Sequence, residues 1–275
     1  MNILIVGHGF VGQAVDYGFE HPSVTKTIVD PKYARELHDI DHDCFDFIFI
    51  CVPTPMGAGG RVDDSILTKV MARLEDTDAI IIIKSTITPD IVSKYKRNNV
   101  VYNPEFLTEK NANEQFINPQ FHVFGGESDA CSNVADLYRN NSNVYPSPAH
   151  VMSLEEASFV KYTINTFLAM KVTFFNQLYD VVNTTDANFA KIANVVGQDN
   201  RIGLSHTRVP GFDGKQGFGG ACFPKDTTAF FDYSSKLTLL EECIRINNEY
   251  RSCYELDERE KEQNIEYNGQ TQKEQ

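Results

Sequence analysis

Three features that would point to particular partners or sites are scarce in the sequence. Positive charge is the first: the 275 residues include 25 Lys and Arg against 38 Asp and Glu, and the formal net charge is −13. Such an excess of negative charge disfavours binding to a phosphate backbone or to an anionic membrane surface. We therefore expect neither a nucleic-acid partner nor a membrane partner.

Long apolar runs are the second scarce feature. The longest strongly apolar stretch, residues 79–83, is far shorter than the roughly 18 residues that span a bilayer. The apolar run at residues 3–6 is too short for the core of a signal peptide and has no basic residue before it. These observations predict a soluble, cytoplasmic protein.

Paired cysteines are the third. The six cysteines, at positions 44, 51, 131, 222, 243 and 253, form no CxxC pair and no cluster with histidine at zinc spacing. We expect reduced thiols, no disulfide framework and no metal site. Most of the six are expected to be small buried apolar residues.

Apolar strand-like runs alternate with helical stretches in the first half of the chain. Residues 80–83 are β-branched throughout and do not alternate with polar residues, which is typical of a strand buried on both faces. The pattern predicts the α/β class, with an N-terminal Rossmann-type doubly wound parallel sheet over residues 1–150 as an NAD-binding domain. Strands are expected at residues 2–7, 25–30, 45–52, 78–84, 99–102 and 122–125, and helices after Gly12 and at residues 65–74, 90–97 and 129–139.

A mainly helical central domain is predicted for residues 151–254. Its first helix runs from Ser153 to about Val182 without internal Gly or Pro, and Ser153 with Glu156 forms a capping box at its start. Because one domain cannot easily cover so many apolar residues, we expect a homodimer that shares this helix. Further helices are expected at residues 187–196 and from 226 or 227 to about 250. Residues 255–275 are almost wholly polar and are expected to form a frayed or disordered tail.

The motif Gly7-His8-Gly9-Phe10-Val11-Gly12 lies between a predicted strand and a predicted helix, and Asp30 ends the next strand. In that context the glycines let the backbone approach a pyrophosphate at the start of the helix. An acidic side chain at the end of the second strand accepts hydrogen bonds from ribose hydroxyls and repels a 2′-phosphate. The pattern therefore predicts NAD rather than NADP. Arg35 either neutralises a cofactor phosphate or is a solvated helix arginine.

Hydroxyl and carboxylate side chains follow three more predicted strands. Thr54, Ser85 and Thr86 come at the ends of two strands, and Glu105 and Glu109 come after a third. Ligands bind at this edge of an open α/β sheet, so we expect the three hydroxyls to be available to the cofactor or the substrate. The two carboxylates either face the same cleft or are exposed loop acids.

Two groups in the second half are candidates for chemistry. Lys161 and Asn165 are four residues apart and share one face of the long helix. The lysine either uses its charge at an oxyanion or reaches solvent. Cys222 lies in the segment GFGGACFPKD, where Lys225 and the start of a following helix favour its thiolate. Such a thiol is suited to be a covalent nucleophile; the alternative is an inert loop cysteine.

Together these motifs resemble the UDP-glucose 6-dehydrogenase family, within the wider nucleotide-sugar 6-dehydrogenases. The resemblance covers about residues 1–250 and is carried, in order, by GHGFVG, CVPTP, KSTITP, NPEFLTE, EEASFVKYTINTFLAMKVTFFNQ, RIG and GFGGACFPKD. It implies a four-electron oxidation of the sugar C6 alcohol of UDP-glucose to a carboxylate, with two NAD molecules used in succession.

The resemblance also implies roles for individual residues. Cys222 would capture the aldehyde as a thiohemiacetal, Lys161 and Asn165 would stabilise the alkoxide or oxyanion, and Arg201 would reach the substrate of the partner subunit. The implied catalytic residues are Cys222, Lys161, Asn165, Asp226, Thr86 and Glu109. The implied cofactor-binding residues are Gly7, Gly9, Phe10, Val11, Gly12, Asp30, Arg35, Val52, Pro53, Thr54, Ser85, Thr86 and Glu109. The implied substrate-binding residues are Glu105, Phe106, Leu107, Lys161, Asn165, Arg201, Phe218, Gly219, Cys222 and Lys225.

The sequence departs from the family pattern in two places. The loop between Gly203 and Gly217 is several residues longer, and the family normally continues into another Rossmann-like domain near the point where this chain stops. We expect a short form that is minimal, is completed in trans, or is weakened. Rival substrates are GDP-mannose and UDP-N-acetylmannosamine. Rival classes are the β-hydroxyacid dehydrogenases, which have no use for Cys222, and a non-catalytic NAD-binding remnant.

Overall fold

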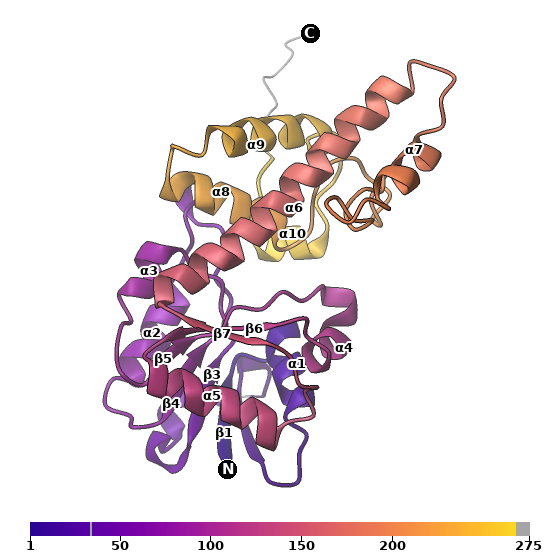
Figure 1. Ribbon diagram of the computed structural model, residues 1–275. Coiled ribbons are helices and arrows are strands. Elements are labelled where there is room, and N and C mark those ends of the chain that lie inside the picture. The colour runs from indigo at the N-terminus through magenta and orange to yellow at the C-terminus, as the bar shows by residue number, and fades with distance from the viewer. Residues whose placement is uncertain (34, 268–275) are drawn as a thin grey trace. The chain divides into compact units, whose positions relative to one another are not determined.

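The computed structural model describes residues 1–33 and 35–267 and divides the chain into two compact units (Figure 1). The first comprises Met1–Thr54 and Asp63–Lys161, and the second comprises Pro55–Val62 and the chain from Tyr162 onward. The division falls within a helix rather than at residue 150, and a short segment after the third strand belongs to the second unit.

A seven-stranded, mostly parallel sheet forms the first unit, so the predicted fold class is confirmed. The strands lie in the order β2-β1-β3-β4-β5-β6-β7. Their bounds are Asn2–Val6 (β1), Thr25–Val29 (β2), Phe47–Ile50 (β3), Ile80–Ile83 (β4), Val100–Tyr102 (β5), His122–Gly126 (β6) and Ala149–Met152 (β7). β2 thus forms one edge of the sheet with β1 and β3 next to it, and the chain order reverses between β1 and β3.

Two strands differ from the prediction. β6 pairs antiparallel to β5, because the chain turns back along the sheet after β5 through the short helix α4 (Ala112–Ile117). β7 was not predicted; it pairs parallel to β6 at the edge, and its residues Ala149, His150 and Val151 are exposed. A short exposed edge strand lacks the buried apolar pattern from which strands are predicted.

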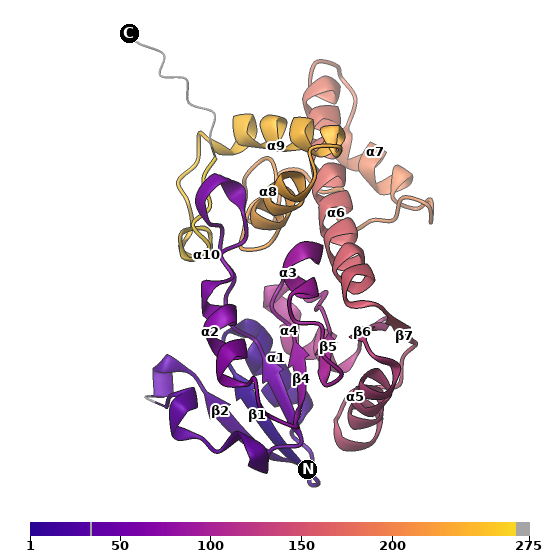
Figure 2. The same ribbon diagram turned by 90° about the vertical axis from the view of Figure 1, so that its left-hand side faces the viewer.

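Helices cover both faces of the sheet. A core of fully buried side chains, including Phe19, Phe49, Val134 and Phe124, joins one face to α1 (Phe10–Gly18), α4 and α5 (Ser128–Asn141). The alternate strand residues, such as Ile81, are buried as well. In Figure 2, α2 (Ser65–Arg73) lies on one side of β4 and α5 on the other. The shorter elements of this unit are α3 (Pro89–Ser93) and the 3₁₀ turns at Pro31–Tyr33, Leu37–Asp39, His42–Cys44 and Glu109–Asn111.

Helix α6 (Leu154–Val182) is continuous through the end of the first unit and the start of the second. The predicted capping box is confirmed, since Ser153 N–H donates to Glu156 Oε2 (2.8 Å) and Glu156 N–H donates to Ser153 Oγ (3.2 Å). None of the helices among the described residues is both long and apolar enough to cross a membrane.

The second unit is helical, with α7 (Phe189–Val196), α8 (Phe223–Tyr233), α9 (Thr238–Arg251) and α10 (Glu258–Glu262), and a 3₁₀ turn at Ala58–Gly60. The single helix predicted over residues 226–250 is wrong, because the chain breaks between α8 and α9. At the break Ser234 N–H returns to the carbonyls of Phe230 and Phe231, which ends α8.

The predicted frayed or disordered tail is wrong as far as Tyr267. Asp257 and Glu260 form a capping box that starts α10, with Glu260 N–H donating to Asp257 Oδ1 and Asp257 N–H donating to Glu260 Oε2, both at 2.9 Å. Glu260 and Ile265 are fully buried. Charged residues that find partners inside the fold do not need an apolar majority to order the chain. Residues 268–275 of the predicted tail lie outside the described residues.

Candidate active site

The Gly7–Gly12 turn connects β1 to α1, and two of its glycines are required by close backbone packing. Gly7 has φ +90°, and a Cβ there would lie 2.6 Å from the carbonyl oxygen of Cys51. A Cβ at Gly12 would lie 2.0 Å from the carbonyl oxygen of Gly7. Gly9 is different: it is the N-cap of α1, and no atom lies within 4 Å of its Cβ position. The turn thus leaves open space where the N–H groups of a helix can receive a phosphate.

Phe10 and Val11 are the first residues of α1 and are half-buried. They pack against the core cluster of the sheet.

Asp30 follows β2 and is 9% exposed. Its Oδ2 accepts the N–H of His8 (2.6 Å), and its Oδ1 accepts the N–H of Lys32 (2.9 Å). Burial opposes ionisation of this carboxyl, but the two backbone hydrogen bonds outweigh burial and lower its pKa. A charged carboxylate is therefore fixed beside the glycine turn. The open position at Gly9 together with this carboxylate fits the pyrophosphate and ribose of a dinucleotide.

Sequence reasoning missed the role of His8 in this turn. Its Nδ1 lies 2.9 Å from the hydroxyl of Tyr33, and its Nε2 lies 3.3 Å from Asp16. The side chain thereby ties the glycine turn to α1 and to the segment after β2. Arg35 is exposed and pairs through its backbone with Asp30.

The hydroxyls expected to be available at the ends of β3 and β4 are engaged with backbone. Thr54 Oγ1 donates to the carbonyl of Thr86 (2.8 Å), and Ser85 Oγ donates to the carbonyl of Val52 (2.6 Å). Their donor protons therefore bind the two loops to each other, and only their acceptor lone pairs are left for a ligand, so their predicted contact with the cofactor stays a prediction. Pro53 is exposed and Thr86 is half-buried.

A buried lysine in the same region was not predicted. Lys84 follows β4, is 4% exposed, and donates through Nζ to the backbone oxygen (3.1 Å) and Oδ1 (3.0 Å) of Asn103. The hydroxyl of Tyr138 donates to the same Oδ1 (2.9 Å). Burial is the main cause that lowers the pKa of Lys84 to about 8. Asn103 opens the segment that carries Glu105, so this network fixes where that segment leaves β5.

Glu105 and Lys161 form a buried ion pair. Lys161 Nζ lies 3.1 Å from Glu105 Oε1 and 2.5 Å from the backbone oxygen of Glu105. The other carboxylate oxygen accepts the N–H of Leu107 (2.5 Å). Lys161 is 2% exposed, so the alternative that it reaches solvent is wrong, and Glu105 is not an exposed loop acid. Phe106 lies over the ammonium, with its ring centre 5.6 Å from Nζ.

The segment continues into the 3₁₀ turn Glu109–Asn111, which Glu109 begins.

A second charged cluster joins α6 to α8 inside the second unit. Asp226 is 1% exposed; its Oδ2 accepts from Asn165 Nδ2 (2.6 Å) and its Oδ1 from Lys225 Nζ (2.7 Å). The ammonium that sequence reasoning assigned to the Cys222 thiol is thus paired with the carboxylate of Asp226. The predicted residues Asn165, Lys225 and Asp226 are brought together.

Cys222 is the N-cap of α8 and is half-buried. The glycine turn before it is held by α6 and α9: Gly217 N–H donates to Asn176 Oδ1 (3.0 Å), and Phe218 exchanges hydrogen bonds with Asn247 (2.6 and 3.0 Å). Gly217 and Gly220 have φ of +73° and +78°, which only glycine adopts without strain. Sequence reasoning missed Asn176 and Asn247, because no local pattern shows which backbone group a helix amide will meet.

Arg201 is exposed in the turn after α7. It donates to both carboxylate oxygens of Asp199, with Nη2 2.6 Å from Oδ2 and Nε 3.0 Å from Oδ1. Its predicted contact with the substrate of a partner subunit stays a prediction.

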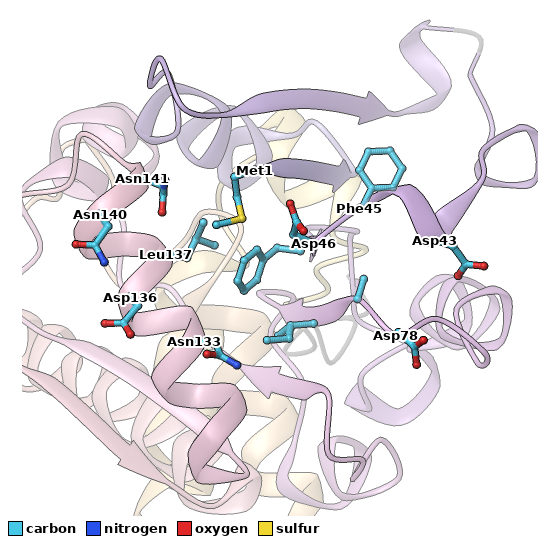
Figure 3. Close-up of a pocket in the computed structure, with 13 residues that line it drawn as sticks. Met1, Asp43, Phe45, Asp46, Asp78, Asn133, Asp136, Leu137, Asn140 and Asn141 are labelled. Carbon is cyan, nitrogen blue, oxygen red and sulfur yellow. The ribbon is translucent and has the colours of Figure 1, made fainter.

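A cavity of about 610 Å³ lies elsewhere in the first unit, at the amino ends of the strands (Figure 3). It is lined by Met1, Asp46, Asp78, Asp136 and Asn140, among others, and contains none of the predicted site residues. Among the described residues no three His, Cys, Asp or Glu side chains are grouped so that they could hold a metal ion.

Comparison with known proteins identifies the family. The model of the UDP-glucose/GDP-mannose dehydrogenase family, NAD binding domain, matches residues 38–142, and the model of the central domain matches residues 155–249. A UDP-glucose 6-dehydrogenase of Rickettsia bellii is 31% identical over 296 residues, which cover 90% of this chain and 67% of that protein. The chain belongs to the UDP-glucose/GDP-mannose dehydrogenase family. This membership confirms the resemblance found in the motifs, and the NAD-binding domain confirms the predicted cofactor.

Other members of the family are similar in sequence or in fold. The UDP-glucose 6-dehydrogenase TuaD of Bacillus subtilis is 33% identical over 228 residues, 75% of this chain and 47% of that protein. A UDP-glucose dehydrogenase of Pyrobaculum islandicum superposes with a TM-score of 0.77 at 26% identity, over 90% of this chain and 68% of that one. A UDP-D-ManNAc dehydrogenase of Pyrococcus horikoshii shares the fold, with a TM-score of 0.75 at 19% identity, over 92% and 69%. The chain thus spans about half to two thirds of the length of these family members.

Proposed function

We propose that this chain is an NAD-dependent UDP-glucose 6-dehydrogenase that oxidises the sugar C6 alcohol to the carboxylate of UDP-glucuronate. The observation that carries the proposal is Cys222, a half-buried thiol at the start of α8, one turn before the buried cluster of Asp226, Lys225 and Asn165. A helix start favours a thiolate. Relatives more than 30% identical are UDP-glucose 6-dehydrogenases, which supports this sugar over GDP-mannose and UDP-N-acetylmannosamine.

The proposed reaction removes four electrons in two steps. Bound NAD supplies a two-electron hydride acceptor, and one is used in each step. In the first step the C6 alcohol loses a hydride and a proton and becomes an aldehyde. The thiol of Cys222 then adds to the aldehyde carbon and forms a thiohemiacetal, which loses a second hydride and a proton to become a thioester. Water cleaves the thioester, which releases the carboxylic acid, ionised as the carboxylate, and restores the thiol.

The other residues are proposed to act on charge and position. Lys161 and Asn165 donate to the alkoxide or oxyanion that develops at C6, where preorganised donors are most effective. In the structure each of them already donates to a buried carboxylate, Lys161 to Glu105 and Asn165 to Asp226. Asp226, Thr86 and Glu109 are proposed to organise water and proton transfer.

Substrate and cofactor contacts complete the proposal. We assign the sugar to Glu105, Phe106 and Leu107 with the glycine turn at Phe218 and Gly219, and the dinucleotide to the Gly7–Gly12 turn and Asp30.

A homodimer is part of the proposal. Phe167, Phe174 and Val181 are spaced by seven residues on α6, and their side chains are 60%, 60% and 63% exposed. Such a stripe on one helix is suited to packing against its symmetric copy. Arg201 is then proposed to reach the substrate of the partner. Because none of the six cysteines forms a disulfide in the part of the chain that the structure describes, we place the protein in the reducing cytoplasm.

The decisive measurement is the number of NADH molecules formed per sugar consumed, with UDP-glucose, GDP-mannose and UDP-N-acetylmannosamine each supplied to the wild type and to Cys222→Ser. We expect two NADH per UDP-glucose in the wild type, and one with released aldehyde in the variant. Cys253→Ser, which removes an exposed thiol of the same unit, should keep two.

Each rival has its own result. Two NADH formed per molecule of a different nucleotide sugar would identify that sugar as the substrate. One NADH per sugar in both the wild type and Cys222→Ser would exclude the thioester mechanism. No NADH, with NAD still bound, identifies a non-catalytic remnant.

A further inference from the structure

The glycine turn before Cys222 is in contact with a carboxylate from the last helix of the described chain. Gly220 N–H donates to Glu260 Oε1 (3.1 Å), and Gly220 lies two residues before Cys222. A Cβ on the neighbouring Gly219 would lie 2.5 Å from the same Oε1 and 2.0 Å from Arg251 Nη2. The turn is therefore packed directly onto an ion pair of Glu260 and Arg251, and the glycine at 219 is the residue that permits this approach.

The ion pair is itself fixed from several sides. Arg251 is 1% exposed and Glu260 is fully buried; Nη2 of the arginine lies 2.8 Å from Glu260 Oε1, and its Nη1 lies 2.7 Å from Asp213 Oδ2. The hydroxyl of Tyr267 also donates to Glu260 Oε1 (2.8 Å), and the guanidinium lies 5.6 Å from the Tyr267 ring centre. Buried charges of this kind carry a desolvation cost, which is offset only where good geometry and further hydrogen bonds satisfy both partners.

Two segments far apart in the chain meet at Arg251. Asp213 comes from the loop between Gly203 and Gly217, and Glu260 comes from α10. Backbone bonds anchor α10 in turn: Met56 N–H donates to the carbonyl of Gln263 (3.0 Å). The contacts form one connected path from the 55–62 segment through α10 to the backbone two residues before the thiol, and all of it lies within the second unit.

We infer that Glu260, held by Arg251, is a positioning residue for Cys222: its carboxylate fixes the Gly217–Gly220 turn and thereby the place from which the thiol attacks. The inference rests on the proposed function for its chemical meaning. Because the thiol enters only after the first hydride has left, a displaced turn impairs capture of the aldehyde and the second oxidation more than the first oxidation, for which the turn supplies only substrate contacts. A merely structural role would lower the amount of active protein and leave the ratio of NADH to sugar unchanged.

The test compares four variants of the full chain. Glu260→Asp keeps the charge but withdraws the carboxylate by one methylene, so Gly220 loses its acceptor. Arg251→Lys keeps the positive charge but offers a single nitrogen to the two carboxylates of Asp213 and Glu260. It replaces Glu260→Asp as the test variant if Glu260→Asp does not fold. Glu258→Gln is the matched control, since Glu258 lies on the same helix, is exposed, and pairs only with Lys261 among the contacts of the described residues.

Two readouts are taken from each variant: NADH formed per UDP-glucose, and hydrogen–deuterium exchange of the backbone amides at residues 217–221. We expect Glu260→Asp and Arg251→Lys to shift the ratio from two towards one with aldehyde released. The second oxidation should slow by about 100-fold, the typical effect of a misplacement near 1 Å. Amide exchange in the turn should be faster. Glu260→Gln keeps the length of the side chain and an acceptor oxygen, so it should retain a ratio near two.

A ratio of two together with unchanged exchange in Glu260→Asp and Arg251→Lys would overturn the inference. If the wild type itself forms no NADH, the proposed function fails, and the positioning is judged without turnover. Iodoacetamide should then alkylate Cys222 faster in the two variants, relative to Cys44 in the same molecule, because a freed turn exposes the half-buried thiol. Equal relative rates in wild type and variants would overturn it.

Discussion

The buried lysine at the end of β4 offers a prediction with a definite sign and size. Lys84 is 4% exposed, and its pKa is lowered from the usual 10.5 to about 8, chiefly by burial. One unit of pKa difference corresponds to 1.36 kcal/mol, so the charged form costs the fold about 3 kcal/mol at neutral pH. Between pH 8 and 10.5 the unfolded chain holds more protons at this site than the native protein. The contribution of Lys84 to the free energy of unfolding therefore rises with pH across that window.

Lys84→Met removes the charge and keeps most of the volume. The variant is relieved of the roughly 3 kcal/mol that burial of the charge costs the wild type. It also loses the two hydrogen bonds from the ammonium to the oxygens of Asn103, each of which contributes about 1 kcal/mol to stability. At pH 7 we expect Lys84→Met to be more stable than the wild type by about 1 kcal/mol. At pH 10.5 the amine is mostly neutral in the native protein and keeps its hydrogen bonds, so the wild type should be more stable by about 2 kcal/mol.

The assay is urea unfolding followed by circular dichroism at a series of pH values from 7 to 10.5. The difference in unfolding free energy between the two proteins is the quantity of interest, because the titrations of groups that do not interact with Lys84 cancel in it. Lys94→Met, at a 60% exposed lysine of the same unit, is the matched control for the loss of a lysine. A difference between Lys84→Met and wild type that stays constant with pH would refute the reasoning.

Three further predictions follow from close contacts. Gly9→Ala should fold normally, since its Cβ meets no atom within 4 Å, yet it should weaken NAD binding at least 10-fold in calorimetry. Gly12→Ala should instead destabilise the protein, because its Cβ would lie 2.0 Å from a carbonyl oxygen. Normal NAD binding by Gly9→Ala would contradict this prediction. Lys161→Met should destabilise the fold by about 3–5 kcal/mol in urea titrations, because Glu105 stays buried without its cation. The double variant Lys161→Met with Glu105→Leu should recover most of that loss of stability. No recovery would show that the charge of Glu105 is not the cause. Phe174→Glu should shift the mass measured by analytical ultracentrifugation from that of a dimer to that of a monomer. Leu239→Glu, at another exposed apolar residue, should leave the mass unchanged. A monomeric wild type would exclude the proposed dimer.

Local rules were sufficient to predict the geometry of the Gly7–Gly12 turn and of Asp30 beside it. The turn from Gly7 to Gly12 and the acidic residue Asp30 are specified by backbone geometry within one strand, one turn and the next strand, so spacing alone predicts them. The capping box of Ser153 and Glu156 was predicted for the same reason, and the structure confirms it. In each case the interacting groups are close in sequence or belong to a motif whose backbone has few solutions.

Partners that are distant in sequence were not predictable in this way. Thr54 and Ser85 were expected to present their hydroxyls to ligands, but each donates to a carbonyl about 30 residues away, as a consequence of strand order. Lys84 meets Asn103 only because β4 pairs with β5, and Tyr138 reaches the same Asn103 oxygen only because α5 packs on the sheet. Sequence patterns identify which residues are polar at a strand end, and tertiary packing decides whether their polar atoms face the ligand or the backbone.

The last helix shows why composition alone misjudged the end of the chain. Residues 255–267 have few apolar side chains, and composition of that kind predicts disorder when charges must remain in water. Here Glu260 accepts hydrogen bonds from Arg251, Tyr267 and Gly220, so its desolvation is offset by partners that come from α9, the segment after α10 and the turn before Cys222. Burial opposes ionisation of Glu260, yet hydrogen bonds, first that from the backbone of Asp257, lower its pKa. The carboxylate should therefore stay charged to a lower pH than an ordinary glutamate, so its hydrogen bonds to Gly220 and Arg251 should persist there as well.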